Sequence, residues 1–108
     1  MIISAIRIRA HPQHQRELLQ VLQGMLEPIR KAAGCRAATL YQDVDNENVV
    51  SLQADWETQA EMEQHVRSEI FSVLRGAIRT LSRHEAAEAR VLSWMAGKEA
   101  IMALRGEK

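Results

Sequence analysis

The hydrophobic positions of the chain alternate between strand-like and helix-like spacing, and they predict the order β-α-β-β-α-β. Two regions have apolar residues at helical spacing: residues 12–33 and residues 58–81. Four segments have the alternation or the density of β-formers that is typical of strands: residues 2–9, 35–44, 49–56 and 89–96. The polar residues 45–48 predict a hairpin turn between the second and third strands. The pattern therefore predicts a small α+β domain.

The first helix is predicted to run from Pro12, which suits a first helical turn, to about Ala33. Pro28 lies inside this helix, and its ring meets the carbonyl four residues earlier, so we expect a bend there. Gly34 is expected to end the helix, because glycine readily takes the left-handed conformation that follows many helices. The apolar face of the helix carries four residues at regular spacing: Leu18, Leu22, Met25 and Ile29.

The second helical region begins with a capping box and is broken once. Thr58 and Glu61 have the T-x-x-E spacing in which each side chain bonds the backbone N–H of the other residue. A short helix then carries His65, and Ser68 is placed to cap a second helix. We expect a polar break at residues 82–85 and, after the last strand, a short C-terminal tail helix at residues 98–104. The second helix has a broad apolar stripe: Ile70, Phe71, Val73, Leu74, Ala77, Ile78 and Leu81.

This order is the ferredoxin-like plan, in which an antiparallel four-stranded sheet has both main helices on one face. The chain contains no linker or repeat, so residues 1–108 are expected to form a single domain. Along the first strand, Ser4 and Ile6 share the face that we expect to meet the helices. The other face mixes Arg7 and Arg9 with apolar residues. Such a face is seldom left bare, and we expect a second copy of the chain to cover it in a homodimer.

Composition narrows the function classes. The 14 Lys and Arg residues balance the 14 Asp and Glu residues, so the chain lacks the basic excess of a nucleic-acid binder. Cys35 is the single cysteine, which fits a reducing compartment, and we interpret it as a small buried residue. No apolar run reaches the roughly 20 residues needed to span a bilayer, and the start of the chain does not resemble a signal peptide. We therefore expect a soluble cytoplasmic protein with no nucleic-acid or membrane partner.

His65 is the strongest candidate for chemistry, because imidazole titrates near neutral pH. The alternative, a histidine that caps carbonyls or packs against the sheet, is at least as well supported, since no carboxylate partner is visible. No metal and no cofactor are expected, because the other histidines lack metal-site spacing and no glycine-rich phosphate loop is present. Six residues are candidates for a substrate pocket, although the same residues also suit a core or, for the tyrosine, a dimer face: Trp56, Phe71, Met62, Tyr41, Ser4 and Ile6.

Five short motifs follow one another along the chain: Gly34-Cys35, Asp43-x-Asp45, Asp55-Trp56-Glu57-Thr58, Met62-x-x-His65 and Ser68-x-x-Phe71. Taken in order, they resemble the antibiotic biosynthesis monooxygenase domain. The resemblance extends from the first predicted strand to the fourth, and its most specific part is the spacing from Trp56 through His65 to Phe71. It implies a dimeric α+β barrel with a pocket between helices and sheet in each subunit.

Similarity to the quinol- and anthrone-oxidising members of this family implies a cofactor-independent monooxygenase. Such an enzyme oxidises a small electron-rich aromatic with O2, and His65 is the residue that we expect to act as base. The alternative is a non-catalytic dimeric ligand-binding or stress-related module of the same fold.

The haem-degrading branch of the family carries a sharper pattern, from which this sequence departs. Its members have an asparagine in the first strand, a tryptophan on the short helix and an iron-binding histidine on the next helix. The corresponding positions here are Ile6, His65 and Arg75, and none of them matches. We therefore do not expect haem degradation.

Overall fold

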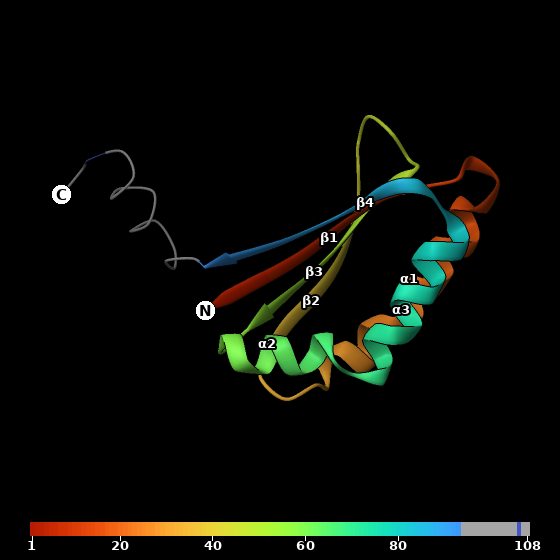
Figure 1. Cartoon of the computed structure of the whole chain (residues 1–108). Helices are drawn as coiled ribbons and strands as arrows, with labels where there is room; N and C mark the ends of the chain where they lie inside the picture. The colour runs from red at the N-terminus through yellow and green to blue at the C-terminus, as the bar shows by residue number, and fades with distance from the viewer. Residues whose placement is uncertain (94–105, 107–108) are drawn as a thin grey trace.

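A computed structural model describes the backbone of residues 1–93 and Gly106, together with the side chains of residues 1–81. Pro12–His14 form a short 3-10 helix, η1, between the first strand and the first α-helix. Figure 1 shows the resulting arrangement, in which the helices gather on one side of the sheet. The other elements, in chain order, are β1 (Ile2–Ala10), α1 (Gln15–Arg30), β2 (Cys35–Gln42), β3 (Val49–Trp56), α2 (Gln59–Val66), α3 (Glu69–Leu81) and β4 (Ser82–Ser93).

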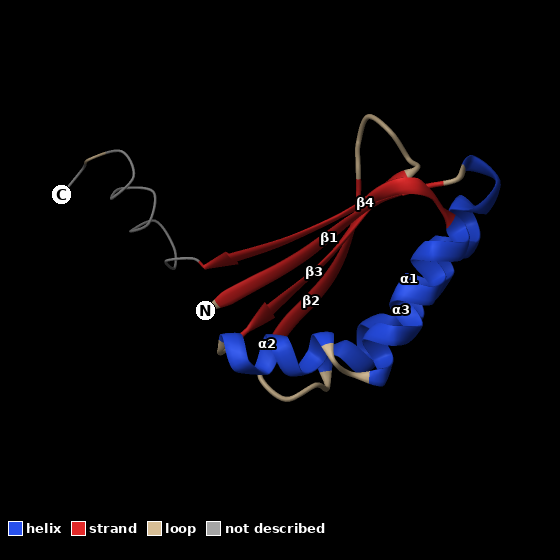
Figure 2. Cartoon of the chain, in the orientation of Figure 1, coloured by secondary structure: helices blue, strands red, loops and turns tan. Residues whose placement is uncertain are grey.

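The strands form one sheet in the order β2-β3-β1-β4, and every neighbouring pair is antiparallel. This is the α+β arrangement that the hydrophobic pattern predicts. The helices cover one face of the sheet, and in the described residues no helix covers the other face (Figure 2). The core therefore lies in the single layer between sheet and helices.

Strand register decides which side chains reach that core. Ser4 of β1 pairs with Ala54 of β3, and Ile6 pairs with Leu52, so these four residues share the face toward the helices. Ala54 and Leu52 are buried on this face, and Trp56 at the end of β3 is fully buried. The predicted orientation of the first strand is confirmed.

Helix α1 buries the predicted stripe, which is Leu18, Leu22, Met25 and Ile29. It begins after η1 and ends at Arg30, three residues before the predicted end, with Pro28 inside its last turn. Gly34 has φ of 81°, the left-handed conformation expected of it. A Cβ at this position would strain the left-handed backbone and would also push aside the flexible carboxylate end of Glu61, so glycine suits this turn.

The breaks around α2 and α3 follow the predicted caps, with one difference. The Glu61 backbone N–H donates to the Thr58 hydroxyl oxygen at 3.2 Å, as a capping box requires. The Glu61 carboxylate, however, accepts from the Thr58 hydroxyl at 3.0 Å and not from its backbone N–H. At the start of α3 the Phe71 N–H donates to the Ser68 hydroxyl oxygen at 3.2 Å. Ser68 is therefore the cap that the sequence predicts.

The polar break predicted at residues 82–85 is wrong. Strand β4 begins at Ser82, directly after α3, and its first residue pairs with Ala10 at the end of β1. Strands pair through backbone N–H and C=O groups, which do not depend on apolar side chains. A polar segment such as residues 82–85 can therefore form a strand without showing a strand pattern in its sequence. Residues 94–96 of the predicted last strand and the predicted tail helix at 98–104 lie outside the described residues.

Candidate functional site

His65 is buried near the end of α2, on the sheet-facing side of the helix. Only 8% of its surface is exposed, and among the described residues it is the one polar or charged residue that is buried. Its ring centroid lies 4.8 Å from that of Trp56, with the two planes inclined by 31°. Phe71 from α3 approaches the imidazole edge-on, at 5.6 Å and 83°. Two aromatic rings from different elements thus fix the orientation of the imidazole.

A hydrogen bond across the sheet holds Trp56 behind His65. The Trp56 indole N–H donates to Ser4 Oγ at 3.0 Å, and the Ser4 hydroxyl lies 3.5 Å from the Ala54 carbonyl oxygen. The antiparallel register of β1 and β3 brings these residues together from distant parts of the chain. The indole is therefore fully buried with its polar group paired.

A small cavity of about 70 Å³ lies beside His65, between the helices and the sheet. Ser4 and His65 bring the polar side chains to its wall, and the other lining side chains are apolar. This inner cavity is lined by Ser4, Ala5, Ile6, Ile29, Leu52, Ala54, Met62, His65, Val66, Phe71 and Leu74.

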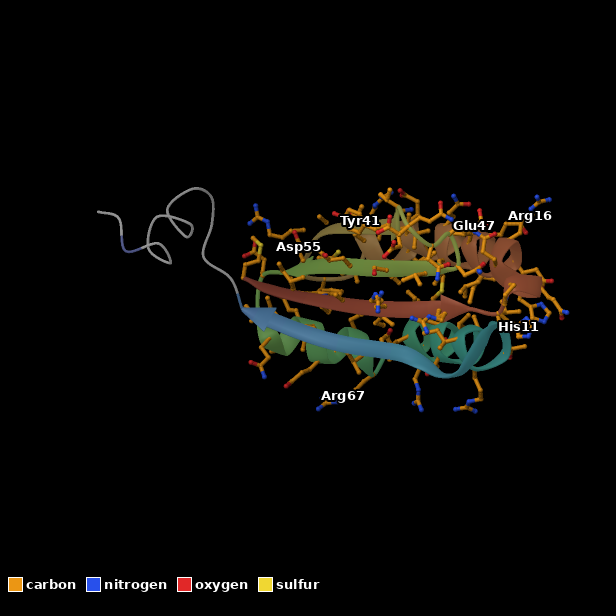
Figure 3. All side chains as sticks on the ribbon, turned by 90° about the horizontal axis from the view of Figure 1, so that it is seen from above. His11, Arg16, Tyr41, Glu47, Asp55 and Arg67 are labelled. Atoms are coloured by element: carbon orange, nitrogen blue, oxygen red, sulfur yellow. The ribbon has the colours of Figure 1, made fainter. Side chains whose placement is uncertain are left out.

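The structure brings most of the predicted pocket residues to this cavity. Trp56 contacts the His65 ring but stands behind it, outside the lining. Tyr41 lies elsewhere: it is 49% exposed and pairs with Ser51 on the sheet face that carries no helix (Figure 3). The predicted residues that line the cavity are His65, Met62, Phe71, Ser4 and Ile6.

A second hollow opens on the outer side of His65. This outer hollow has a volume of about 170 Å³ and is lined by Ala32, Ala33, Glu61, Gln64, His65, Ser68 and Ile70. Sequence reasoning did not select Gln64 or Ser68 for a site. The signal that could have found them is their spacing, because Glu61, Gln64, His65 and Ser68 recur at three or four residues along one side of α2 and its end.

Burial makes His65 a neutral imidazole at physiological pH. Its Nδ1 atom is buried and has no hydrogen-bond partner among the described residues. Burial lowers the pKa of His65 below its ordinary value, because the charged form loses hydration without gaining a carboxylate partner. A proton on Nδ1 would be an unpaired buried donor, so the neutral form with its proton on Nε2 suits this environment.

The lowered pKa of His65 predicts a loss of stability in mild acid. The unfolded chain binds a proton at the ordinary histidine pKa of about 6.5, whereas the folded chain binds it only at lower pH. Stability is therefore complete above about pH 6.5 and falls toward the folded-state pKa, by at most about 1.4 kcal/mol per pH unit. Urea unfolding of the parent chain and His65→Asn at about pH 7.5 and pH 5 checks this. An equal loss in both proteins would contradict it.

Three other features could have indicated a function: a metal site, a reactive thiol and a membrane-spanning helix. No group of three His, Cys, Asp or Glu side chains within that part of the chain could hold a metal ion. The Cys35 thiol lies 3.4 Å from the Ala37 carbonyl oxygen, and burial raises its pKa, so it stays protonated. Arg75 is exposed on α3. Among the described helices none is long and apolar enough to cross a membrane.

Comparison with known proteins identifies the family of the chain. The family model for antibiotic biosynthesis monooxygenases matches residues 1–76, from β1 into α3, and so includes His65 and both hollows beside it. The chain belongs to the antibiotic biosynthesis monooxygenase family. A search of curated proteins gives no match.

Solved structures share the fold of this antibiotic biosynthesis monooxygenase domain at low sequence identity. Rv0793 from Mycobacterium tuberculosis is 21% identical, with 89% of this chain and 96% of that chain covered and a TM-score of 0.80. PA3566 from Pseudomonas aeruginosa is 24% identical, with coverage of 88% and 94% and a TM-score of 0.77. SnoaB, a cofactor-independent oxygenase from Streptomyces nogalater, is 18% identical, with coverage of 89% and 94% and a TM-score of 0.76. These likenesses establish the fold.

Proposed function

We propose that the protein is a cofactor-independent monooxygenase that oxidises a small electron-rich aromatic with O2, at the site centred on His65. The substrate class is a quinol, an anthrone or a related polyketide. The observation that carries the proposal is a buried imidazole on the wall of an apolar cavity, with no hydrogen-bond partner for its Nδ1 atom among the described residues. Family membership and the fold shared with SnoaB support the same reaction class.

The proposed reaction draws its electrons from the substrate. Loss of a proton from an activated C–H or O–H group gives an anion that passes an electron to O2. For an anthrone, one oxygen atom then forms the new carbonyl group and the other leaves as water. The protein supplies orientation, a site with little water, and one group that accepts the proton. Neutral His65 is that group in this proposal, because its lowered pKa keeps the imidazole unprotonated at neutral pH.

Oxygen uptake with a panel of anthrones and hydroquinones tests the function. We expect at least one compound to be consumed faster with the protein than by background autoxidation in the same buffer. If no compound raises the uptake, the protein is a non-catalytic ligand-binding module of the same fold. That alternative is favoured because no carboxylate among the described residues is hydrogen-bonded to His65 Nδ1 to activate the imidazole as a base.

We further propose that two copies pack their open sheet faces together. This face combines small, polar and charged side chains, including Thr39 and Tyr41 on β2 and Gln53 and Asp55 on β3. Figure 3 looks onto it and shows Tyr41 and Asp55 on neighbouring strands. Arg7 and Arg9 on β1 share this face with Asp55. In a two-fold interface, arginines of one copy opposite aspartates of the other would give complementary charge.

Sedimentation at micromolar concentration tests the homodimer. We expect a species with twice the mass of the 12.2 kDa chain. Tyr41→Asp should shift the equilibrium toward monomer, because it places an unpaired charge on the sheet face that forms the proposed interface. Arg16→Asp, an exposed change on α1, is the matched control and should leave the dimer intact. A parent chain that sediments only as monomer would overturn the proposal.

A further inference from the structure

The wall of the inner cavity has two polar side chains, which come from different layers of the fold. His65 belongs to α2 in the helical layer, and Ser4 belongs to β1 in the sheet. The proposed reaction uses the imidazole to accept a proton, but it gives the Ser4 hydroxyl no task. In an apolar pocket, the few polar groups decide how a ligand is oriented. The hydrogen bonding of Ser4 therefore bears on which ligands the cavity can hold.

The Ser4 hydroxyl has a good donor beside it but a poor acceptor for its own proton. The Trp56 indole N–H donates to Ser4 Oγ at 3.0 Å and occupies one of the lone pairs of the oxygen. The acceptor that the hydroxyl reaches is the Ala54 carbonyl oxygen at 3.5 Å. Ordinary O–H···O bonds are shorter, at roughly 2.5–3.0 Å. Because a serine hydroxyl rotates freely, its proton can turn to a better acceptor inside the cavity.

Trp56 makes Ser4 a donor toward the cavity. An indole N–H can only donate, and the fully buried ring holds this group against Ser4 Oγ. A hydroxyl that accepts one hydrogen bond becomes a stronger donor of the next, because chains of hydrogen bonds polarise one another. The ligand atom that suits this position is an acceptor, such as a carbonyl or phenolic oxygen.

An aromatic ring can enter the inner cavity once a wall side chain moves. The cavity volume of about 70 Å³ is roughly half the 150 Å³ of an engineered cavity that binds benzene. Met62 lines the cavity, and an unbranched methionine side chain changes its conformation easily. Val66 also lines the cavity and is 44% exposed, so the cavity meets solvent at this residue. A ring that enters there reaches both Ser4 and His65.

We propose that the Ser4 hydroxyl binds the substrate by donating a hydrogen bond to a ring oxygen, while His65 takes the proton from another position of the same ring. This assignment rests on the proposed function. It narrows the substrate class to rings with an oxygen across the ring from the C–H or O–H that loses its proton. Anthrones and 1,4-hydroquinones both have this arrangement. In an anthrone the negative charge moves onto the carbonyl oxygen, so the bond from Ser4 strengthens as the proton leaves, and Ser4 keeps its own proton.

Acetophenone labelled with ¹³C at its carbonyl tests the donor without turnover. This aryl ketone should shift the methyl signals of Ile6 and Leu52 on the cavity wall, but not those of fully exposed Val44. Its carbonyl ¹³C signal should lie downfield of its position in an apolar solvent, because a hydrogen bond withdraws electron density from the carbonyl carbon. α-Methylstyrene has a CH2 group in place of the carbonyl oxygen, and it is the matched ligand without an acceptor.

Removal of the hydroxyl should affect the ketone alone. Ser4→Ala should weaken acetophenone binding about tenfold, the value of one hydrogen bond, and return the carbonyl signal toward its apolar position. α-Methylstyrene should bind as it does to the parent chain. Ser4→Cys keeps a similar shape with a weaker donor, and it should move both ketone readings in the same direction if Ser4→Ala does not fold. Ser72→Ala removes an exposed hydroxyl on α3 and should leave both affinities unchanged.

The ketone readings can also contradict the role of Ser4. A carbonyl signal at its apolar position in the parent chain would overturn it, as would unchanged ketone binding by folded Ser4→Ala. Methyl shifts that miss Ile6 and Leu52 would place the ketone outside the inner cavity, with the same consequence. A protein that binds the ketone through Ser4 but consumes no oxygen refutes the monooxygenase proposal alone. An active enzyme that binds the ketone without help from Ser4 refutes the donor alone.

Discussion

Replacing His65 by alanine is expected to lower the protein-dependent oxygen uptake roughly 10²- to 10⁴-fold at neutral pH, the range that a positioned acid–base group contributes. His65 lines both hollows, and no other titratable side chain is buried at the inner cavity within the described residues. Its removal therefore leaves the inner cavity without a group that can accept a proton. The measurement is the initial rate of oxygen consumption with whichever panel compound the parent chain oxidises.

Two controls separate a catalytic effect from a structural one. His65→Gln keeps a polar side chain of similar length but cannot accept a proton, so it should also be slow. His14→Ala removes a partly exposed imidazole on η1, which contacts Glu17 far from the cavity lining, and it should retain the parent rate. Circular dichroism must show that each variant is folded. Parent-like uptake by folded His65→Ala would keep the reaction and discard the assigned residue.

Replacing Trp56 by alanine is expected to reduce the free energy of unfolding by about 3–5 kcal/mol, the usual cost of deleting a large buried aromatic side chain. The indole is fully buried in the main core and packs against the His65 ring. Its loss removes apolar burial, leaves a void and deprives Ser4 Oγ of its donor. Urea unfolding at a fixed protein concentration measures the effect, since a dimer makes stability depend on concentration.

Milder substitutions identify the part played by the hydrogen bond. Trp56→Phe keeps an aromatic ring beside His65 but removes the indole N–H, and Ser4→Ala removes its acceptor. Each should cost about 1–3 kcal/mol, because one buried polar group loses its partner. The double variant should cost less than the sum of the two. Additive costs would mean that the bond between Trp56 and Ser4 contributes little.

Much of the fold follows from local patterns. Alternation along residues 2–9 placed Ser4 and Ile6 on the face toward the helices, and the paired register confirms this. Helical spacing identified the buried stripe of α1, and the T-x-x-E pattern located the start of α2. The polar start of β4 was not predicted as a strand, because its pairing with β1 is made by backbone groups, which the side-chain pattern does not show.

The candidate site was only partly accessible to sequence reasoning. Spacing singled out Trp56, His65 and Phe71, and the structure brings their rings together. The sequence also suggested Tyr41 as a pocket residue. The alternation of side chains along a strand shows that the strand has two faces, but it does not show which face the helices cover. The outer hollow was missed because Ala32 and Ala33, from the loop after α1, meet α2 only in the folded chain.

By itself, the sequence determined the order of elements and the caps that break α2 from α3, since each depends on neighbours within a few residues. Tertiary structure alone decided that Ser4 bonds Trp56 across 52 residues, that His65 is buried with no partner for Nδ1 among the described residues, and that His65 lines two hollows. These features depend on strand register and helix packing, which set distances between residues far apart in the chain and leave no local pattern in it.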